Sequence, residues 1–321
     1  MEKLEEKLLE ILMSNPDRYI SGEQIARTIG TNRMEVKRLI KRLRKRGFVI
    51  ISMPRIGYKL MVKGEFEHLH EILRESLPSR RTTGVLHLVT CTSTQDIAVS
   101  LVKVGVVEDL LVVCERQTRG RGRFGRHWSS DEGGLWFSIT YPELAMGLIG
   151  VLNLGVGVAV ASSIRSLYGV DALLKWPNDV LVGKKKIAGV LIEGVFGDSM
   201  SRVVIGVGVN VNNELPGDLR ETATTLRDLK GHVLPRTPLM ISIIRYLDEI
   251  IGDIMGGNAD GVISRWKALT NMLGKDVKIS KGGRTFYGVA VDIDRLGGLV
   301  VRLQSNELVT LYAGDVISIY I

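Results

Sequence analysis

Between residues 85 and 210 the sequence alternates between short apolar runs, rich in β-branched residues, and stretches with helical spacing. The runs "VLHLV", "DLLVVCE" and "LWFSITY" are typical of strands, and "MGLIGVLNLGVGVAVASSIRSLYG" is typical of a long helix. The runs "ALLKW", "KIAGVLIEG" and "RVVIGVGVNV" follow as further strands. Segments in this order predict an α+β domain, in which helices pack on a mixed sheet.

The first 63 residues predict a separate, basic module. They hold 15 Lys and Arg against 7 Asp and Glu, whereas the rest of the chain holds 28 of each, so the module carries the whole net charge of +8. Helical spacing indicates three helices in it. The second opens with the capping box Ser21-x-x-Gln24 and ends at Gly30, and we expect Thr31 to cap the third. The run "FVIISMPRIGYKLMV" predicts two strands around a Pro/Gly turn.

This order of elements indicates a winged helix-turn-helix, whose third helix enters the major groove of DNA. The alternative is a charged helix face that is merely solvated. The capping box, the glycine turn and the hairpin together favour DNA binding, with lysines and arginines on the phosphates. We expect the DNA-binding side chains to be Arg33, Lys37, Arg38 and Lys41.

A chain of 321 residues is longer than one core usually supports, which predicts several domains. We expect a winged helix-turn-helix in residues 1–63, a linker in 64–80, a central domain in 81–270 and a small C-terminal domain in 271–321. Within the linker, "GEFEHLHEILRES" predicts a helix and "LPSRRTTG" a polar connector.

The composition excludes several classes of protein. Cys91 and Cys114 stand in no metal-ligand spacing, which indicates buried thiols of a cytosolic protein rather than a disulfide framework or a zinc site. No apolar run has the length of a membrane span, and the start "MEKLEEKLLE" does not have the pattern of a signal peptide. We therefore expect a cytoplasmic protein with no membrane partner.

The segment "QTRGRGRFGRHWSS", residues 117–130, carries the letters of the dinucleotide-binding fingerprint. That fingerprint requires a helix to begin at its third glycine, but "RHWSSDEGG" is turn-like and leads into a strand, so a Rossmann loop is excluded. Glycines let a ligand approach the backbone, and guanidinium groups bind carboxylates and phosphates. The segment therefore predicts an anion-binding loop. A loop for single-stranded nucleic acid is disfavoured because its aromatic residues are not interleaved with the arginines.

A second motif is "LKWPNDVLVGKKKIAGVLIEG", residues 174–194, in which a turn and a lysine-rich turn each precede a strand. Asn178 and Asp179 are either turn residues only or ligand-binding groups. Lys184, Lys185 and Lys186 are consistent with a solvated hairpin tip. Lys186 adjoins the second strand, and we expect it to point into the domain.

Two shorter motifs complete the set. Ser93-x-x-Asp96 predicts a helix cap, and a helix N-terminus also suits polar groups of a ligand. The run "GVGVNVNN" offers glycines for close approach and amides such as that of Asn210. The histidines are scattered and no nucleophile elbow is present, so we expect neither a histidine base nor a covalent enzyme intermediate. Lysine and arginine around a glycine loop indicate phosphoryl or nucleotidyl transfer through charge neutralisation.

In this order, "STQ", "QTRGRGRFGRHW", "KWPNDVLVGKKKIAGVLIE" and "GVGVN" resemble the biotin–protein ligases, and the resemblance spans nearly the whole chain. The basic module, with its wing "SMPRIGYKL", resembles the bifunctional subgroup that also represses biotin-synthesis genes. Residues 274–319 resemble the small SH3-like C-terminal barrel of that family. The arginine loop and the Lys-Trp-Pro-Asn-Asp segment are the most specific of these motifs.

The resemblance implies a reaction in two steps, with biotin and ATP as substrates and Mg²⁺ as the metal. The biotin carboxylate attacks the α-phosphate of ATP, which gives biotinyl-5′-AMP and pyrophosphate. A lysine amine of a biotin carboxyl carrier protein domain then attacks the mixed anhydride. This chemistry agrees with a site that orients two ligands and neutralises charge.

The resemblance also implies roles for individual residues. Lys186 would bridge the biotin carboxylate and the α-phosphate and, together with Arg121 and Arg123, would carry the catalysis. The implied biotin-binding residues are Ser93, Thr94, Gln95, Gln117, Arg121, Gly122, Arg123 and Lys186. The implied nucleotide-binding residues are Trp128, Asn178, Asp179 and Asn210. Trp128 either stacks on a planar group or anchors the loop, and anchoring is favoured. Asp179 is the candidate magnesium ligand.

The family usually has Ser-Thr-Asn where this chain has Ser93-Thr94-Gln95, so the contact made by the longer amide is open. The loop "NNELPGDLRETATTL" corresponds to the segment that folds over the adenylate. We also expect a homodimer that places two basic helices on two half-sites of an operator.

Two alternatives remain open at this point. A lipoate–protein ligase uses related chemistry on a similar fold. A transcription factor that only senses a small ligand would need the basic module but not the reactive groups. Lys186, Arg121 and Arg123 disfavour a sensor, because sensing does not require cations aimed at a reacting phosphate.

Overall fold

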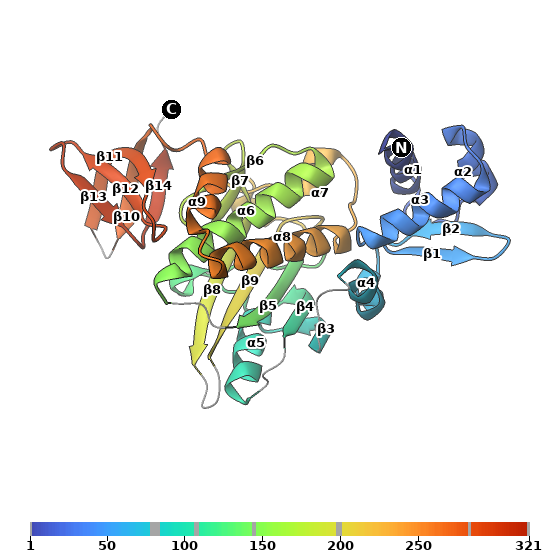
Figure 1. Cartoon of the computed structure of the whole chain (residues 1–321), viewed down its shortest axis with the longest axis horizontal. Coiled ribbons are helices and arrows are strands. Elements are labelled where there is room, and N and C mark those ends of the chain that lie inside the picture. The colour runs from blue at the N-terminus through green and yellow to red at the C-terminus, as the bar shows by residue number, and fades with distance from the viewer. Residues whose placement is uncertain are drawn as a thin grey trace.

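The computed structural model describes residues 2–77, 84–105, 109–142, 146–196, 201–281 and 284–319. Three parts follow one another along the long axis of the molecule (Figure 1). The basic module lies at one end, a seven-stranded sheet with its helices lies in the middle, and a five-stranded sheet lies at the other end. This arrangement confirms the predicted α+β fold class and its three parts.

The N-terminal part consists of three helices and a hairpin, as the sequence predicts. Its elements are α1 (Glu2–Met13), α2 (Gly22–Ile29), α3 (Arg33–Lys45), β1 (Ile50–Met53) and β2 (Gly57–Leu60). The Ser21 hydroxyl accepts a hydrogen bond from the Gln24 amide at 3.1 Å, and Gly30 ends α2 in the left-handed region. The predicted cap of α3 is wrong. Asn32 directly precedes the first helical residue, and its Oδ1 accepts from the Glu35 amide at 2.9 Å, so Thr31 lies one residue too early.

The linker is folded over most of its described length. A 3₁₀ turn, η1 (Glu65–His68), leads into α4 (Leu69–Ser76), and both pack with buried apolar side chains against the neighbouring parts. The helix predicted for this segment is therefore confirmed, although its first turn is 3₁₀. The polar connector "LPSRRTTG" falls mainly on residues 78–83, which lie outside the described residues.

The central sheet has seven strands in the order β3-β4-β5-β9-β8-β7-β6. Strands β3 and β4 are parallel and are joined through α5 (Thr94–Lys103), whereas all other neighbours are antiparallel. The strands are β3 (Gly84–Cys91), β4 (Leu110–Gln117), β5 (Leu135–Pro142), β6 (Ala172–Lys175), β7 (Asp179–Val182), β8 (Lys185–Phe196) and β9 (Ser201–Val209). The mixed sheet expected from the alternating segments is confirmed, with β3 at one edge.

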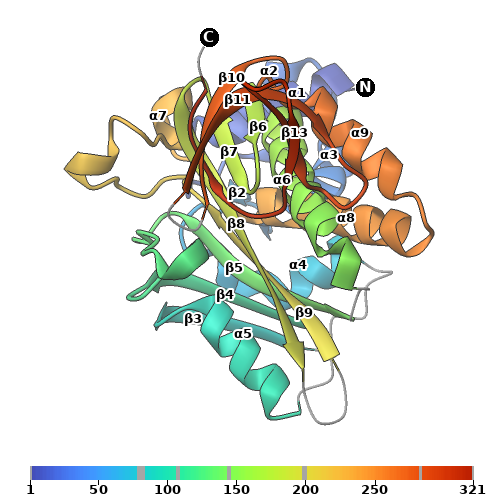
Figure 2. The ribbon, with the colours of Figure 1, turned by 90° about the vertical axis from the view of Figure 1, so that its left-hand side faces the viewer.

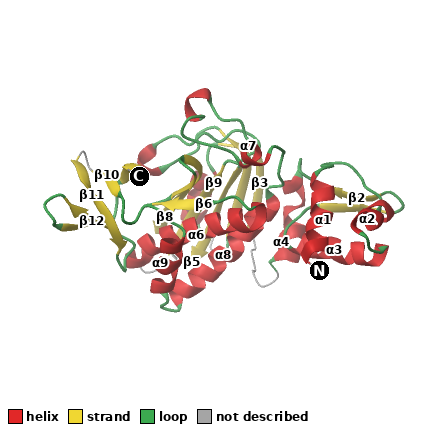
Figure 3. Cartoon of the chain, turned by 90° about the horizontal axis from the view of Figure 1, so that it is seen from above, coloured by secondary structure: helices red, strands yellow, loops and turns green. Residues whose placement is uncertain are grey.

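Helices cover both faces of this sheet. α5 covers one face (Figure 2). α6 (Ile149–Tyr168) covers the other, with α8 (Thr237–Met255) and α9 (Ala259–Ala268) packed beside it (Figure 3). A short helix, α7 (Leu226–Lys230), precedes α8. Because side chains alternate along a strand, Phe137 of β5 faces the larger helical layer, while Ser138 faces α5. A polar group in a buried strand is thereby directed to the α5 face.

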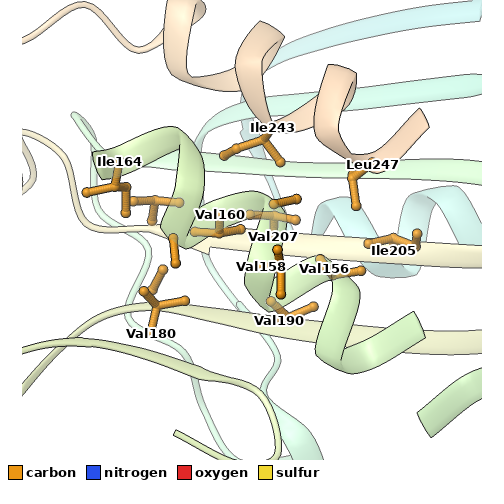
Figure 4. Close-up of a cluster of buried hydrophobic side chains, with 14 of the residues drawn as sticks. Val156, Val158, Val160, Ile164, Val180, Val190, Ile205, Val207, Ile243 and Leu247 are labelled. Atoms are coloured by element: carbon orange, nitrogen blue, oxygen red, sulfur yellow. The ribbon is translucent and has the colours of Figure 1, made fainter. Parts of the chain in front are cut away.

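α6 is the central helix of the main core. Figure 4 shows side chains of α6 between those of α8, such as Ile243, and those of strands β8 and β9, such as Val190 and Val207. Among the described residues α6 is the one helix long and apolar enough to cross a membrane, which the sequence analysis did not anticipate. It has this composition because it is covered by protein on several sides, and most of its side chains are buried. The cytoplasmic location stays a prediction.

The two cysteines lie on the neighbouring strands β3 and β4 and are free and buried. A hydrogen bond between the thiols, together with burial, raises the pKa of Cys91. A neutral, buried thiol agrees with the structural role that the sequence favours for these residues.

The winged module packs on the first half of α8. Gly47, which follows α3, has a φ of +93°, and a Cβ there would lie 2.8 Å from the Ile241 side chain. The Arg245 guanidinium donates to the backbone carbonyl of Ser76 at 2.7 Å and also to that of Lys45. One side chain of α8 thus holds the C-terminal ends of both α3 and α4.

The C-terminal part is a five-stranded antiparallel sheet in the order β13-β12-β11-β10-β14. Its strands are β10 (Asp276–Lys281), β11 (Arg284–Ile293), β12 (Leu299–Leu303), β13 (Leu308–Leu311) and β14 (Asp315–Ile319). The indole of buried Trp176 donates to the Gly297 carbonyl at 3.1 Å and so joins this sheet to the central part. Figure 2 views the molecule from this end.

Candidate functional site

A cavity of about 210 Å³ opens on the α5 side of the central sheet. The arginine loop, the strands β8 and β9, and the Lys-Trp-Pro-Asn-Asp turn surround it. It brings together eleven of the predicted ligand residues: Ser93, Thr94, Gln95, Gln117, Arg121, Gly122, Arg123, Trp128, Asn178, Asp179 and Lys186. Asn210 does not line it. Its side chain is buried and accepts from the amide of Asn213 at 3.3 Å.

The closed end of the cavity is a network of hydroxyl and amide groups. The Thr94 backbone N–H donates to Gln117 Oε1 at 2.8 Å, and the Thr94 and Ser138 hydroxyls lie 2.9 Å apart. Ser138 donates to Gln95 Oε1 at 3.0 Å, and Gln95 Nε2 donates to the Val204 carbonyl at 3.3 Å. The longer amide of Gln95 is therefore accommodated by the β9 backbone. We call these side chains, with Ser93, the polar floor.

The polar floor stands at the N-terminus of α5. Ser93 is the cap of this helix, and its hydroxyl accepts from the Asp96 amide at 3.5 Å, as the capping box predicts. The positive end of the helix dipole favours acceptor oxygens of a bound ligand. Hydrogen-bonding groups of both kinds at one buried end suit a compact polar head group rather than a purely apolar one.

The arginine loop is folded back on itself. The Gln117 amide donates to the Ser130 carbonyl at 3.0 Å, and the Trp128 amide donates to the Gly120 carbonyl at 2.8 Å. A Cβ on Gly120 would lie 2.4 Å from the Trp128 carbonyl, so only glycine fits there. The tip of the arginine loop is the exposed Phe124, which has a φ of +56°. No helix begins at Gly125, which agrees with the rejection of a Rossmann loop.

The two arginines predicted to act together have different environments. Arg121 Nε lies 2.7 Å from Asp96 of α5, and its terminal nitrogens donate to both oxygens of Glu193 of β8 at 3.3 and 2.8 Å. Arg123 instead donates to Asn178 Oδ1 at 3.4 Å and to the Gly314 carbonyl at 3.2 Å. Two carboxylates thus hold the Arg121 guanidinium, whereas Arg123 bonds to the Lys-Trp-Pro-Asn-Asp turn and to the C-terminal part.

The C-terminal sheet reaches this site. Arg123 bonds to the carbonyl of Gly314, and Val316 of β14 lines the cavity. Residues near the end of the chain therefore complete a pocket whose other walls come from the central part.

Lys186 is held between an acid and an aromatic ring. Its Nζ lies 2.5 Å from Asp179 Oδ1 and 4.9 Å from the centre of the Trp128 ring. The Trp128 ring covers Gly189 of β8 and Gly208 of β9, where an added Cβ would lie 2.9 and 2.8 Å from it. Trp128 therefore anchors the loop on the sheet, which agrees with the favoured of its two predicted roles.

The loop between β9 and α7 also borders Lys186. The Lys186 amide donates to the Thr222 carbonyl at 2.8 Å, and the Thr224 amide donates to the Lys186 carbonyl at 3.0 Å. Residues 213–225 thus run beside the start of β8. The segment expected to fold over a bound ligand is tied to the backbone of the lysine expected to act on it.

The described residues contain no group of three or more His, Cys, Asp and Glu side chains suited to a metal ion. Among the described residues that line the cavity, Asp179 is the one carboxylate. A donor set of this kind fits Mg²⁺ that arrives with the phosphates of ATP, because Mg²⁺ is usually bound by one or two carboxylates together with substrate phosphates.

The residues predicted to bind DNA lie on the solvent face of α3. Arg33, Lys37, Arg38 and Lys41 are all exposed, while Val36, Leu39, Ile40 and Leu43 form the buried face. Arg38 forms an ion pair with Glu35 of the same helix at 3.1 Å. The face is positioned to meet a polyanion.

Comparisons with known proteins agree with this geometry. Residues 88–210 match the Biotin/lipoate A/B protein ligase family, residues 272–317 match the Biotin protein ligase C terminal domain, and residues 5–59 match the HTH domain. The bifunctional ligase/repressor BirA of Bacillus subtilis is 31% identical over 98% of both chains.

The chain belongs to the biotin–protein ligase family.

Two further similarities support this assignment. The biotin–[acetyl-CoA-carboxylase] ligase of Mycobacterium tuberculosis is 32% identical over 66% of this chain and 79% of its own length. The structure of the biotin protein ligase from Aquifex aeolicus in complex with biotin and ATP is 27% identical, has a TM-score of 0.65, and is covered over 97% of its length by 72% of this chain.

Several residues that shape the site of this biotin–protein ligase were not predicted from the sequence. Ser138 interrupts the apolar run "LWFSITY" with a small hydroxyl side chain, which was a usable signal. Asp96 and Glu193 gave none, because an acid in the first turn of a helix and one near a strand end are common. Val316 of the C-terminal sheet reaches the cavity only through the packing of two domains.

We expect Arg121 of this ligase-family chain to position the loop through its two carboxylates. Arg121→Ala should lower kcat/KM for pyrophosphate release about tenfold, because two partly exposed ion pairs are lost. Glu193→Gln should lower it by a smaller factor, and Arg119→Ala, an exposed arginine of the same loop, should leave it unchanged. A direct ligand role for Arg121 would instead give full activity in Glu193→Gln and a far larger loss in Arg121→Ala.

Proposed function

We propose that this protein activates biotin with ATP and transfers it to a carrier protein. In the first step a biotin carboxylate oxygen bonds to the α-phosphorus of ATP, the bond from that phosphorus to the bridging oxygen breaks, and pyrophosphate leaves. In the second step the neutral amine of a carrier lysine bonds to the acyl carbon. AMP leaves, and the amine releases its proton to solvent.

The observation that carries the proposal is the cavity itself. One end is the polar floor, and the other holds the cations of Lys186 and Arg123. A molecule with a polar head, an apolar arm and a carboxylate would place its carboxylate beside these cations. Preorganised positive charge at that point stabilises the negative charge that develops on two reacting anions.

Each group has a role in this proposal. Lys186 neutralises the carboxylate and the α-phosphate, and Asp179 holds it in place until they bind. Arg123 closes on the phosphate from the side of the C-terminal sheet. Asn178 accepts from Arg123 and donates to the Val190 carbonyl at 2.7 Å, which fixes its orientation. Catalysis then comes from positioning and charge neutralisation.

Magnesium and ATP enter as one complex in this proposal. Magnesium would supply additional positive charge on the phosphates, and Asp179 is the residue that would hold it. Asn210 acts indirectly, because its backbone carbonyl accepts from the Leu226 amide at 3.1 Å and so fixes the end of the 213–225 loop.

Lys186→Ala should reduce biotin-dependent pyrophosphate release about 100- to 1000-fold, because the main cation at the reacting groups is removed. Lys184→Ala is the matched control, since Lys184 is exposed on the same hairpin. Biotin and lipoate are supplied in parallel, with ATP and Mg²⁺. Pyrophosphate release that depends on lipoate and not on biotin would show that lipoate is the substrate. No release with either acid would indicate a protein that only senses a ligand.

We also propose that the winged module binds operator DNA through the exposed face of α3. This makes the protein a biotin-responsive repressor, a role consistent with the name of its Bacillus subtilis relative. The exposed lysines and arginines of α3 support phosphate contacts, and the hairpin β1–β2 stands beside them as the wing.

Lys37→Ala combined with Lys41→Ala should weaken binding to any DNA duplex and reduce the slope of log K against log salt by about 1.8. Both side chains are exposed on α3, and Lys7→Ala on the exposed face of α1 is the control. Fluorescence anisotropy over a range of salt concentrations measures the effect. An unchanged slope would place the DNA-binding surface elsewhere.

We propose further that the protein forms a homodimer through β3. This strand is the edge of the central sheet, and none of the described strands pairs with its outer side. Val89 on it is 74% exposed. Two copies paired at this edge would form a continuous sheet and present two α3 helices to two half-sites.

Val89→Glu should raise the dimer dissociation constant at least about tenfold, because a charge on an edge strand opposes pairing. Val104→Glu is the control, since Val104 is 78% exposed but follows α5 instead of lying on the edge. Sedimentation velocity with and without biotinyl-5′-AMP measures the effect. Equal weakening by both substitutions would exclude β3 as the interface.

A further inference from the structure

The segment that leaves the winged module carries a fully buried carboxylate. Glu65 has 0% exposed surface, and it lies in η1, five residues after the end of β2. Its oxygens accept hydrogen bonds from the backbone N–H groups of Arg236 and Thr237 at 2.9 Å and from the Thr237 hydroxyl at 2.8 Å. α8 has no side-chain cap of its own, so Glu65 caps it from a distant part of the chain.

One arginine connects this carboxylate to the central sheet. Arg236 Nε donates to Glu65 at 3.0 Å, and its terminal nitrogens donate to both oxygens of Glu115 at 2.6 and 3.3 Å. The same guanidinium donates to the Gly134 carbonyl at 3.1 Å and lies 4.4 Å from the centre of the Phe66 ring. The Arg236 side chain is 5% exposed. We call Glu65, Arg236, Thr237 and Glu115 the junction cluster.

The junction cluster adjoins the polar floor along β4. Glu115 lies two residues before Gln117 on this strand, and the side chain of Gln117 accepts from the Thr94 amide. A displaced Glu115 would therefore shift the end of β4 that carries Gln117. A change in the junction cluster would thus move one wall of the cavity, although none of its four residues lines the cavity.

A second connection runs to the loop beside Lys186. The Gly133 carbonyl, next to Gly134, accepts from the Asn212 amide at 2.9 Å. The Asn212 side chain pairs with the backbone of Leu234 through two bonds of 2.8 Å, and Leu234 lies two residues before Arg236. These bonds close a ring that fixes the start of the 213–225 loop.

We propose that Glu65 and Arg236 are positioning residues for biotin binding, which act through Gln117 and the 213–225 loop and so make the exit of the winged module part of the support of the ligand pocket. The inference rests on the proposed biotin ligase function. It does not require contact between the winged module and the ligand. Two routes connect the junction cluster with the pocket: the strand β4 from Glu115 to Gln117, and the hydrogen bonds of Asn212 with Gly133 and Leu234.

The test compares variants that disturb the same interface in different ways. Glu65→Gln keeps the shape of the side chain but removes the negative charge that pairs with Arg236. Glu67→Gln, in the same 3₁₀ turn but exposed, is the matched control. Arg245→Ala loosens the docking of the winged module at Lys45 and Ser76 without touching the junction cluster.

Glu65→Gln should raise the Kd and KM for biotin about tenfold, in the range of measured couplings between distant sites, and leave kcat within about twofold. Glu67→Gln and Arg245→Ala should leave all three values unchanged. Calorimetric titration with biotin gives Kd in the full-length chain, and pyrophosphate release gives KM and kcat. If Glu65→Gln does not unfold cooperatively, Arg236→Lys replaces it, since lysine keeps the charge but cannot reach both Glu115 and Gly134.

An unchanged Kd in a folded Glu65→Gln or Arg236→Lys protein would overturn the proposal. An equal rise in Arg245→Ala would also overturn it, because the effect would then come from general loosening of the winged module. If the unaltered protein binds biotin but releases no pyrophosphate, the ligase function fails while the calorimetric comparison still decides the positioning role.

Discussion

The site depends on three glycines in two central strands, because a side chain at any of them would occupy the space above the sheet. Gly189 of β8 pairs with Gly208 of β9, and neither position tolerates a Cβ because the Trp128 ring lies directly above them. Gly206, further along β9, leaves room for the Gln95 amide in the same way. Without these glycines the sheet would fill the space in which the cavity opens. The arginine loop, anchored there by Trp128, could not lie over it.

Charge around this cavity is arranged in two classes. Arg121 is paired with two carboxylates and serves the loop, whereas Lys186, which is paired with Asp179, and Arg123 stand at the cavity. A site for joining two anions needs cations held in place before the ligands arrive. The same principle appears at the junction cluster, where Arg236 links a carboxylate of the linker with one of the central sheet. Fixed charges therefore hold both the reactive groups and the module expected to bind DNA.

Much of the fold could be predicted because local patterns repeat: strand runs, capping boxes and the helix-turn-helix spacing. The motifs also identified eleven residues that line one cavity. The different roles of Arg121 and Arg123 could not be read from "RGR", because they depend on Asp96, Glu193 and Gly314, which are distant in sequence. The burial of α6 and the exclusion of Asn210 from the cavity follow likewise from tertiary packing.

The central claim is that one cavity holds the head group of biotin on the polar floor and its activated carboxylate beside Lys186 and Arg123. A crystal structure of the chain with biotinyl-5′-AMP tests this most directly. The account predicts hydrogen bonds from the head group to Thr94 and Gln117, and the phosphate within hydrogen-bonding distance of Lys186. An adenylate bound elsewhere, or bound here with its phosphate away from Lys186, would contradict it.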